Sequence, residues 1–288
     1  MSDESNEPPV NTVSEYIDRI MTHYGKEKKV KHLFFRGQYK KDTYGLIPSA
    51  FRKPWMGKEK AILLDFCNYA DVHGVSYDKV YEIDKLLGEM QHYRLPTRFL
   101  DWSVSPLVAL FFACERGEDK DEKDCKEDGA VYIFNPWRYR VEFLDIGAYC
   151  DKEVPNNHQI QILSRALLAY GWHYNEILKY LEKRYPVVNV KREQFQYPYP
   201  TVPTFSNDRK LHQRGTFLVW GENTGFDIKR LITQQGYGYS IIIPYTAKEG
   251  ILKALNKLYI NEYTVYPDYV GMRKMMDSRG SLFNVVEE

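Results

Sequence analysis

Charged side chains stand directly before one of the most apolar runs of the chain. Positions 92 to 113 read HYRLPTRFLDWSVSPLVALFFA, which sets His92, Arg98 and Asp101 among aromatic and aliphatic neighbours. Burying a lone charge in such surroundings is costly, so each of these groups needs a partner. Two interpretations follow. The charges fasten the structure by satisfying one another, or they line a pocket for a polar ligand.

Two other polar clusters are candidates for the same pocket. In FFRGQ, the planar guanidinium of Arg36 matches a phosphate or carboxylate, and Gly37 lets a ligand or a second backbone come close. Further along the chain, Gln213 and Gly215 precede the apolar run TFLVW, and Glu222 follows it. For each cluster a purely structural role stays open, because ion-pair networks that only fasten loops are common.

These three clusters give the candidate site. The candidate catalytic residues are Arg36, His92, Asp101, Gln213 and Glu222. The candidate ligand-binding residues are Gly37, Gln38, Thr97, Arg98, Trp102, Ser105 and Gly215. We expect Arg36, His92, Arg98, Asp101 and Gln213 to converge, with Trp102 available to stack on a flat ring. No metal is predicted, because the four cysteines show no ligand spacing.

The elements that must position these residues can be predicted from local patterns. Ser105 followed by Pro106 is a helix start, an N-cap and then proline at the first helical position, for the buried helix LVALFFAC. Helical spacing appears from residue 13 and over most of 58–90, and strands are expected at LFF, AVYIF, TFLVW and YGYSIIIPY. Thr246 and Glu249 predict a capping box. The segment QFQYPYPTVPTF is expected to be irregular and to lie on the surface.

This mixture of elements predicts an α+β fold, a single mixed domain with a short-stranded, largely antiparallel sheet flanked by helices. Residues 1–10 are expected to be a disordered tail and residues 11–288 one domain. Within it we expect a motif core at 34–136, a helical insertion at about 155–186, and C-terminal strands and helices at 211–280.

Composition narrows the class of protein. The formal net charge of +1 provides no bulk field to recruit nucleic acid or an anionic membrane. No apolar run approaches the roughly 20 residues that span a bilayer, and the acidic start MSDESNEPPV does not resemble a signal peptide. Scattered cysteines are typical of reduced thiols. These features predict a cytoplasmic protein with no membrane partner, and they leave its oligomeric state open.

Several of the same residues resemble a known family. Phe35, Arg36, Gly37 and Gln38 are similar to the motif that names the FRG domain family, and GEMQHYRLPTRFLDWSVSPLVALFFAC resembles that family's central block. The family's later elements are matched by Gln213, Gly215 and Phe217 and by Tyr266, Pro267 and Asp268. The resemblance implies a bacterial or phage protein, with a role in defence against phage.

A second resemblance implies an ADP-ribosyltransferase-like fold that uses NAD as cofactor. Arg36 is similar to the first-strand arginine of those enzymes, Asp101 to Ser105 with PLVALFFA to their strand and helix, and Gln213 to their late turn. Arg36 would then hold a phosphate or ribose, and the residues around Ser105 would shape the nicotinamide side. The chain departs from the pattern at Gly215, where a catalytic glutamate belongs, so Glu222 or Asp101 would have to supply the carboxylate.

Three functions therefore remain open. The first is an NAD- or nucleotide-using enzyme with ADP-ribosyltransferase-like chemistry. The second is a nuclease or an RNA- or DNA-binding effector, with phosphate contacts from KEKKVKH and base stacking on QFQYPYP. The third is a non-catalytic sensor or interaction module, in which Arg36 and Arg98 pair with Asp101 and Glu89. The expected partner is a nucleotide-type small molecule, and a nucleic-acid or protein target stays open.

Overall fold

A six-stranded antiparallel sheet organises the chain. The computed structural model describes residues 7–26, 33–41, 45–77, 83–116, 126–144, 173–184, 195–201 and 211–267, with 269, 271–273 and 276. In these residues the strand order is β4-β5-β2-β1-β3-β6, and every neighbouring pair is antiparallel. The strands are β1 (Phe34–Gln38), β2 (Phe99–Ser103), β3 (Gly129–Phe134), β4 (Tyr199–Thr201), β5 (Gly215–Val219) and β6 (Gly238–Ile243). The predicted α+β class and antiparallel sheet are confirmed.

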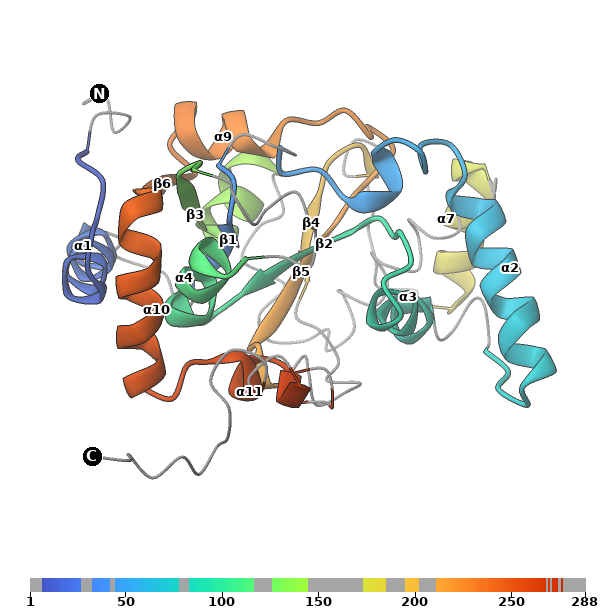
Figure 1. Ribbon diagram of the computed structural model, residues 1–288. Coiled ribbons are helices and arrows are strands. Elements are labelled where there is room, and N and C mark those ends of the chain that lie inside the picture. The colour runs from blue at the N-terminus through green and yellow to red at the C-terminus, as the bar shows by residue number, and fades with distance from the viewer. Residues whose placement is uncertain are drawn as a thin grey trace.

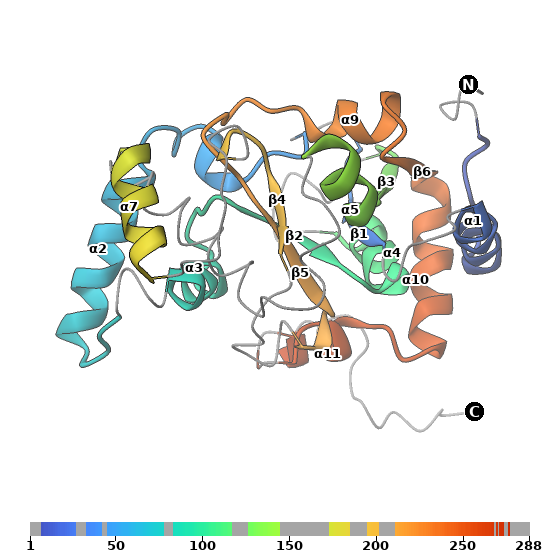
Figure 2. The ribbon, with the colours of Figure 1, turned by 180° about the vertical axis from the view of Figure 1, so that it is seen from behind.

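Helices cover both faces of this sheet. Figures 1 and 2 show α1, α4 and α10 on one side of the molecule and α2, α3 and α7 on the other. The helices are α1 (Val13–Lys26), α2 (Glu59–Val72), α3 (Ile83–His92), α4 (Pro106–Cys114), α5 (Pro136–Arg138), α7 (Tyr174–Arg184), α9 (Ile228–Gln234), α10 (Lys248–Lys257) and α11 (Glu262–Val265). Short turns of 3-10 helix occur at η2 (Ser49–Phe51) and η7 (Tyr245–Ala247), and a π-helical turn occurs at η4 (Tyr139–Phe143). None of the described helices is long and apolar enough to cross a membrane.

The alternation of side chains along the strands divides the core in two. Phe35 packs with Val131 and Ile241 in the cluster that includes α1, α4 and α10. Phe34, one position earlier, packs with Phe134 in the cluster that includes α2 and α3. Successive residues of a strand point to opposite faces, so adjacent positions of β1 serve two different cores.

The helix α4 begins where the sequence predicts. Ser105 is its N-cap, with the side-chain oxygen accepting from the amide of Val108, and Pro106 occupies the first helical position. The capping box expected at Thr246 and Glu249 is wrong, because η7 occupies residues 245–247 and α10 starts at Lys248 without a side-chain cap. A capping box occurs instead at the start of α11.

Two other expectations need correction. Val10, assigned to the disordered tail, is fully buried and its amide donates to Ile242 at the end of β6. The segment QFQYPYPTVPTF is not simply a surface loop, because it contains β4 at the sheet edge and the buried rings of Phe195 and Tyr199. Residues 155–172 and 185–186 of the expected helical insertion, and the charged stretch 117–125, lie outside the described residues.

Candidate functional site

The strands β1 and β2 separate after a single pair of residues. Their register consists of Phe35 opposite Ser103, whereas β1 and β3 share five pairs. A continued ladder would bring Arg36 opposite Trp102 on the same face, and Gly37 opposite Asp101. The ladder stops, and the Nη1 of Arg36 donates to the backbone carbonyl of Asp101. A guanidinium therefore links the two strands where their backbones move apart.

Three side chains beside this gap keep buried polar atoms without partners. Among the described residues, the Nε of Arg36, the Nε1 of Trp102 and the Oε1 of Gln38 have no hydrogen-bond partner. Arg36 and Gln38 themselves remain partly exposed. Buried polar atoms without partners are uncommon in folded proteins, and an absent ligand or water is a frequent reason for them. The cluster offers two N–H donors and one oxygen acceptor.

Electrostatics at this point favour an anion. Burial lowers the pKa of Arg36 to about 10, the negative charge of Asp101 acts to raise it, and the positive charge of Arg52 acts to lower it. The Arg36 guanidinium stays a cation at neutral pH. The guanidinium of Arg52 is close enough to disfavour that cation, and a bound anion would offset the repulsion between the two positive charges.

The loop that carries Arg52 is fastened beside the gap. The Nε2 of Gln38 donates to the carbonyl of Gly45, 3.1 Å away. Thr97 is fully buried, its amide donates to the hydroxyl of Ser49, and its carbonyl accepts from Ala50. The observed contacts of Thr97 position this loop, and its predicted role in ligand binding stays a prediction.

Arg98 is fully engaged by other groups. Its Nε and Nη2 each lie 2.6 Å from a carboxylate oxygen of Glu59, and its Nη1 donates to the carbonyl of Trp220 at 3.2 Å. The side chains are only 8% and 14% exposed. This fastening matches the structural interpretation of the charge at position 98, with Glu59 as the partner where Glu89 was expected.

Gly37 brings two backbones together. A Cβ at this position would lie 1.9 Å from the carbonyl oxygen of Ala109 and 2.6 Å from the amide nitrogen of Ala113. Its close neighbour is thus the backbone of α4, which was one of the two possibilities for this glycine. The space beside Gly37 on that side is filled by protein.

The remaining candidates lie along β2 and β5. Gly215 stands opposite Ser103, and the hydroxyl of Ser103 donates to the carbonyl of Gln213 at 2.7 Å and accepts from the amide of Ser105 at 2.9 Å. The Nε2 of Gln213 donates to the carbonyl of Val265 in α11. These residues form the entrance to β5 and α4.

Glu222 lies past the other end of β5, where it accepts from the Nε2 of Gln196. The strand between Gly215 and Val219 spans roughly 13 Å at the usual rise per residue, so Gln213 and Glu222 occupy opposite ends. A shared catalytic role for the two is not supported by this placement.

His92 ends α3, with its ring edge-on to Tyr93 at 5.2 Å between centroids and its Nδ1 buried without a partner. No hydrogen bond or ion pair in the described part of the chain joins His92, Arg98 or Gln213 to Arg36. Of the five residues expected to converge, a direct contact is observed between Arg36 and Asp101. Within the same residues, no group of three or more His, Cys, Asp or Glu is placed to hold a metal ion.

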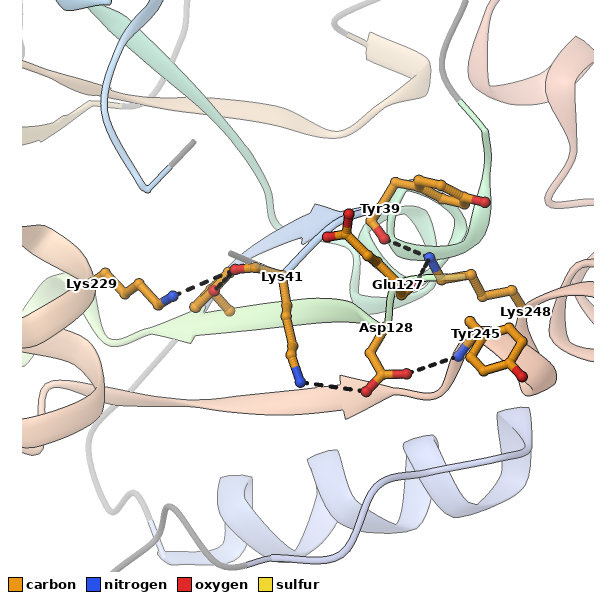
Figure 3. A network of polar contacts seen from close by, with 8 residues as sticks. Tyr39, Lys41, Glu127, Asp128, Lys229, Tyr245 and Lys248 are labelled. Atoms are coloured by element: carbon orange, nitrogen blue, oxygen red, sulfur yellow. Dashed lines mark hydrogen bonds and ion pairs between the residues drawn. The ribbon is translucent and has the colours of Figure 1, made fainter. Parts of the chain in front are cut away.

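A lysine network that sequence reasoning missed anchors the segment after Gln38 (Figure 3). The buried Nζ of Lys248 donates to the carbonyls of Tyr39 and Glu127 and lies 3.4 Å from the centroid of the Tyr39 ring. The carbonyl of Lys41 accepts from the Nζ of Lys229, and the Nζ of Lys41 pairs with Asp128 at 3.4 Å. No spacing in the sequence signals these contacts, because their partners are separated by 87 to 209 positions.

The family comparison covers the same region. Residues 31–122 match the family model of the FRG domain, and this range includes β1, β2 and all residues of the gap between them. No curated protein and no solved structure matches the chain. The matched range includes Arg36, Gly37 and Gln38 and the block around Asp101, which carry the motif resemblance. Residues 31–122 of the protein therefore match the FRG domain, and the rest of the chain lies outside that match.

Proposed function

We propose that the protein binds a nucleotide-type ligand, with NAD as the favoured one, where β1 and β2 separate. The observation that carries this proposal is the pair of buried donors, the Nε of Arg36 and the Nε1 of Trp102, on adjacent strands without acceptors. A phosphate oxygen is an acceptor for both, and a guanidinium binds phosphate through two parallel bonds when its fork is available. The positive charge of Arg52 adds to the attraction.

The unpartnered Oε1 of Gln38 extends the site from phosphate to a sugar. An amide oxygen accepts a hydrogen bond from a hydroxyl. In a nucleotide the ribose hydroxyls lie close to the phosphate, so one of them can donate to the Oε1 of Gln38 while the phosphate is bound by Arg36. The lysine network supports this role, because it holds the backbone at Tyr39 and Lys41 directly after Gln38. A nucleotide would thus supply an acceptor for Arg36 and Trp102 and a donor for Gln38.

Transferase chemistry at this site requires a carboxylate. The bond between ribose C1 and nicotinamide would break, nicotinamide leaving with the bonding electron pair, and water or a target nucleophile would bond to C1. A carboxylate stabilises the positive charge that develops on the ribose. Asp101 is our choice for this role, because its charge acts on Arg36, whereas Glu222 is engaged by Gln196 beyond the far end of β5.

The alternatives receive different support. The Arg98–Glu59 fastening fits an interaction module, in which such motifs are structural. Base stacking on QFQYPYP is less favoured, because Phe195 and Tyr199 are buried in the core. The stretch KEKKVKH falls mostly outside the described residues. A role in defence against phage rests on the FRG resemblance alone.

A thermal-shift series tests the binding proposal. The wild type is heated with NAD, ADP-ribose, inorganic phosphate or nicotinamide, beside Arg36→Lys, which keeps the charge but removes the Nε donor. Arg230→Lys, an exposed change on α9, is the matched control. At about a hundredfold excess over the dissociation constant, a ligand stabilises by about 2.7 kcal/mol, which raises the melting temperature by several degrees.

Distinct outcomes follow from the series. We expect shifts with NAD and ADP-ribose in the wild type and in Arg230→Lys, and smaller ones in Arg36→Lys. Release of nicotinamide from NAD, lost in Asp101→Asn while NAD still binds, would support the transferase step. The absence of a shift with every phosphate-bearing ligand would end the proposal and favour the interaction module.

A further inference from the structure

A second candidate binding site lies away from the gap between β1 and β2. A cavity of about 730 Å³ opens between α2, the segment that follows it, and the segment that follows α3. Its volume is in the range of sites that hold small organic molecules. None of the residues that line it belongs to the nucleotide site proposed above.

The walls of this cavity are mostly aromatic. Its rings come from Trp55, Phe66, Tyr69, Tyr77 and Tyr93. Phe66 lies at the centre, with its ring centroid 6.1 Å from that of Tyr77 and 6.3 Å from that of Tyr93. Trp55, Tyr69 and Tyr93 are 42%, 66% and 65% exposed. Ring surface that stays open to water around a concave site is available to stack on a ligand.

The charge of the cavity has one sign. Among the described residues that line it, Asp65 is the only carboxylate, and none is a lysine or arginine. Asp65 makes no hydrogen bond or ion pair with any residue in the described part of the chain. Among the described lining residues His73 is the other ionisable group apart from the tyrosines, and its Nδ1 lies 2.8 Å from the carbonyl of Tyr69. Among the described lining residues, a cation would find the countercharge of Asp65, whereas an anion would find no lysine or arginine.

The aromatic cluster already accepts a cation from the protein itself. The Nζ of Lys85 lies 5.8 Å from the centroid of the Tyr77 ring, within the range of a cation–π contact. The negative faces of the rings and the Asp65 carboxylate therefore favour the same kind of ligand. We propose that this cavity binds an organic cation that carries a flat aromatic ring, with the ring between the tryptophan and tyrosine side chains and the charge near Asp65.

This proposal goes beyond the nucleotide site and does not depend on it. The test compares three probes of similar size, N-methylquinolinium as the cation, quinoline as the neutral ring and 1-naphthoate as the anion. Binding to the full chain is measured by isothermal titration calorimetry in the same buffer for all three probes. We expect N-methylquinolinium to bind about tenfold tighter than quinoline, and 1-naphthoate to bind most weakly.

Variants separate the charge from the shape. Asp65→Asn keeps the volume of the side chain and should remove the preference for the cation over quinoline. Asp71→Asn, an exposed carboxylate of α2 outside the cavity, should leave it intact. Tyr69→Ala, at a mostly exposed position, should weaken the binding of N-methylquinolinium and of quinoline. Equal affinity for the three probes, or a cation preference that survives Asp65→Asn, would overturn the proposal, and Arg36→Lys should not affect any of these affinities.

Discussion

At the scale of single residues, the bond between Arg98 and Glu59 is the most testable contact of the FRG domain. Both side chains are largely buried, and the carboxylate receives two bonds of 2.6 Å. Replacing Glu59 by alanine leaves the guanidinium in the interior, with the carbonyl of Trp220 as its remaining hydrogen-bond acceptor among the described residues. Removing one member of a buried pair costs about 3–5 kcal/mol of the free energy of unfolding. We expect Glu59→Ala to lose that amount in urea denaturation followed by circular dichroism.

An exposed ion pair provides the matched control for this loss. Glu249 and Lys253 are 79% and 74% exposed on α10, one turn apart. Surface pairs of this kind contribute little to stability. Glu249→Ala should leave the denaturation midpoint nearly unchanged. If Glu59→Ala behaves like Glu249→Ala, then the fastening role assigned to Arg98 is wrong, and position 98 would again be a candidate for ligand binding.

The thiol of Cys114 provides a test of how deeply α4 is buried. Burial raises the pKa of Cys114 to about 12, although the positive charge of Lys248 acts in the opposite direction. The protonated thiol is therefore favoured in the folded state, and this contribution to stability is complete below the ordinary pKa of 9.0 and lost as the pH rises toward about 12.

Alkylation with iodoacetamide measures this protection directly. Because the thiolate is the reactive species, the folded protein should leave the Cys114 peptide unmodified at about pH 9, and unfolding in urea should make it react. Peptide mass spectrometry gives the fraction modified in each state. Equal modification rates in the folded and unfolded protein would show that the cysteine is accessible and that α4 is not packed against β1 in solution.

At the scale of elements, the contact between β1 and α4 depends on a glycine. A Cβ at Gly37 would overlap the carbonyl of Ala109 and the amide of Ala113, which are backbone atoms that no side-chain rotation can move. Gly37→Ala should therefore push α4 away from the sheet and cost at least about 2 kcal/mol of the free energy of unfolding. The measurement is chemical denaturation of the purified variant.

The same substitution at Gly250 should change the free energy of unfolding in the opposite direction. Gly250 lies within α10, and a Cβ there would meet no atom within 4 Å. Alanine is favoured over glycine in a helix by about 0.5–1 kcal/mol. Gly250→Ala should therefore stabilise the protein by that amount. If the two variants changed stability equally, the close approach at Gly37 would not be the reason for its effect.

Local rules predicted the elements that depend on local contacts. Ser105 and Pro106 fix the start of α4 through bonds to residues three positions away, so its boundary could be read from the sequence. The edge strand β4 was missed because Pro200 argues against a strand. Proline is tolerated there since β4 has a single neighbour, β5, and only one of its edges must supply donors.

In the candidate site, too, the contacts between residues far apart in the sequence were the ones that local patterns could not predict. The sequence places Arg36 and Asp101 near each other only through the pairing of β1 with β2, and that pairing held for one residue pair. The partner of Arg98 was mistaken because Glu59 lies 39 positions away on α2, and helix periodicity cannot say which carboxylate reaches β2. The aromatic cavity draws its rings from four separate segments between residues 55 and 96, so no single stretch of sequence reveals it.

At the scale of the whole molecule, the FRG domain occupies the centre of a larger sheet. Its strands β1 and β2 share one pair, Phe35 opposite Ser103, while five pairs join β1 to β3 and five join β2 to β5. Both β3 and β5 lie after residue 122, where the family match ends. The N-terminal helix adds to this dependence, because Tyr16 is fully buried and its hydroxyl donates to the carbonyl of Pro106.

A fragment of residues 31–122 is therefore expected not to fold. It would leave both outer edges of β1 and β2 unpaired and would remove Val131 and Ile241, which pack in one cluster with Phe35 in the full chain. For the fragment we expect no cooperative thermal transition by circular dichroism and poorly dispersed amide signals by nuclear magnetic resonance. The full chain should show a cooperative transition and well-dispersed amide signals. A cooperative transition in the fragment would mean that β1 and β2 pair further without β3 and β5, which would close the gap that Arg36 now bridges and move the proposed ligand site elsewhere.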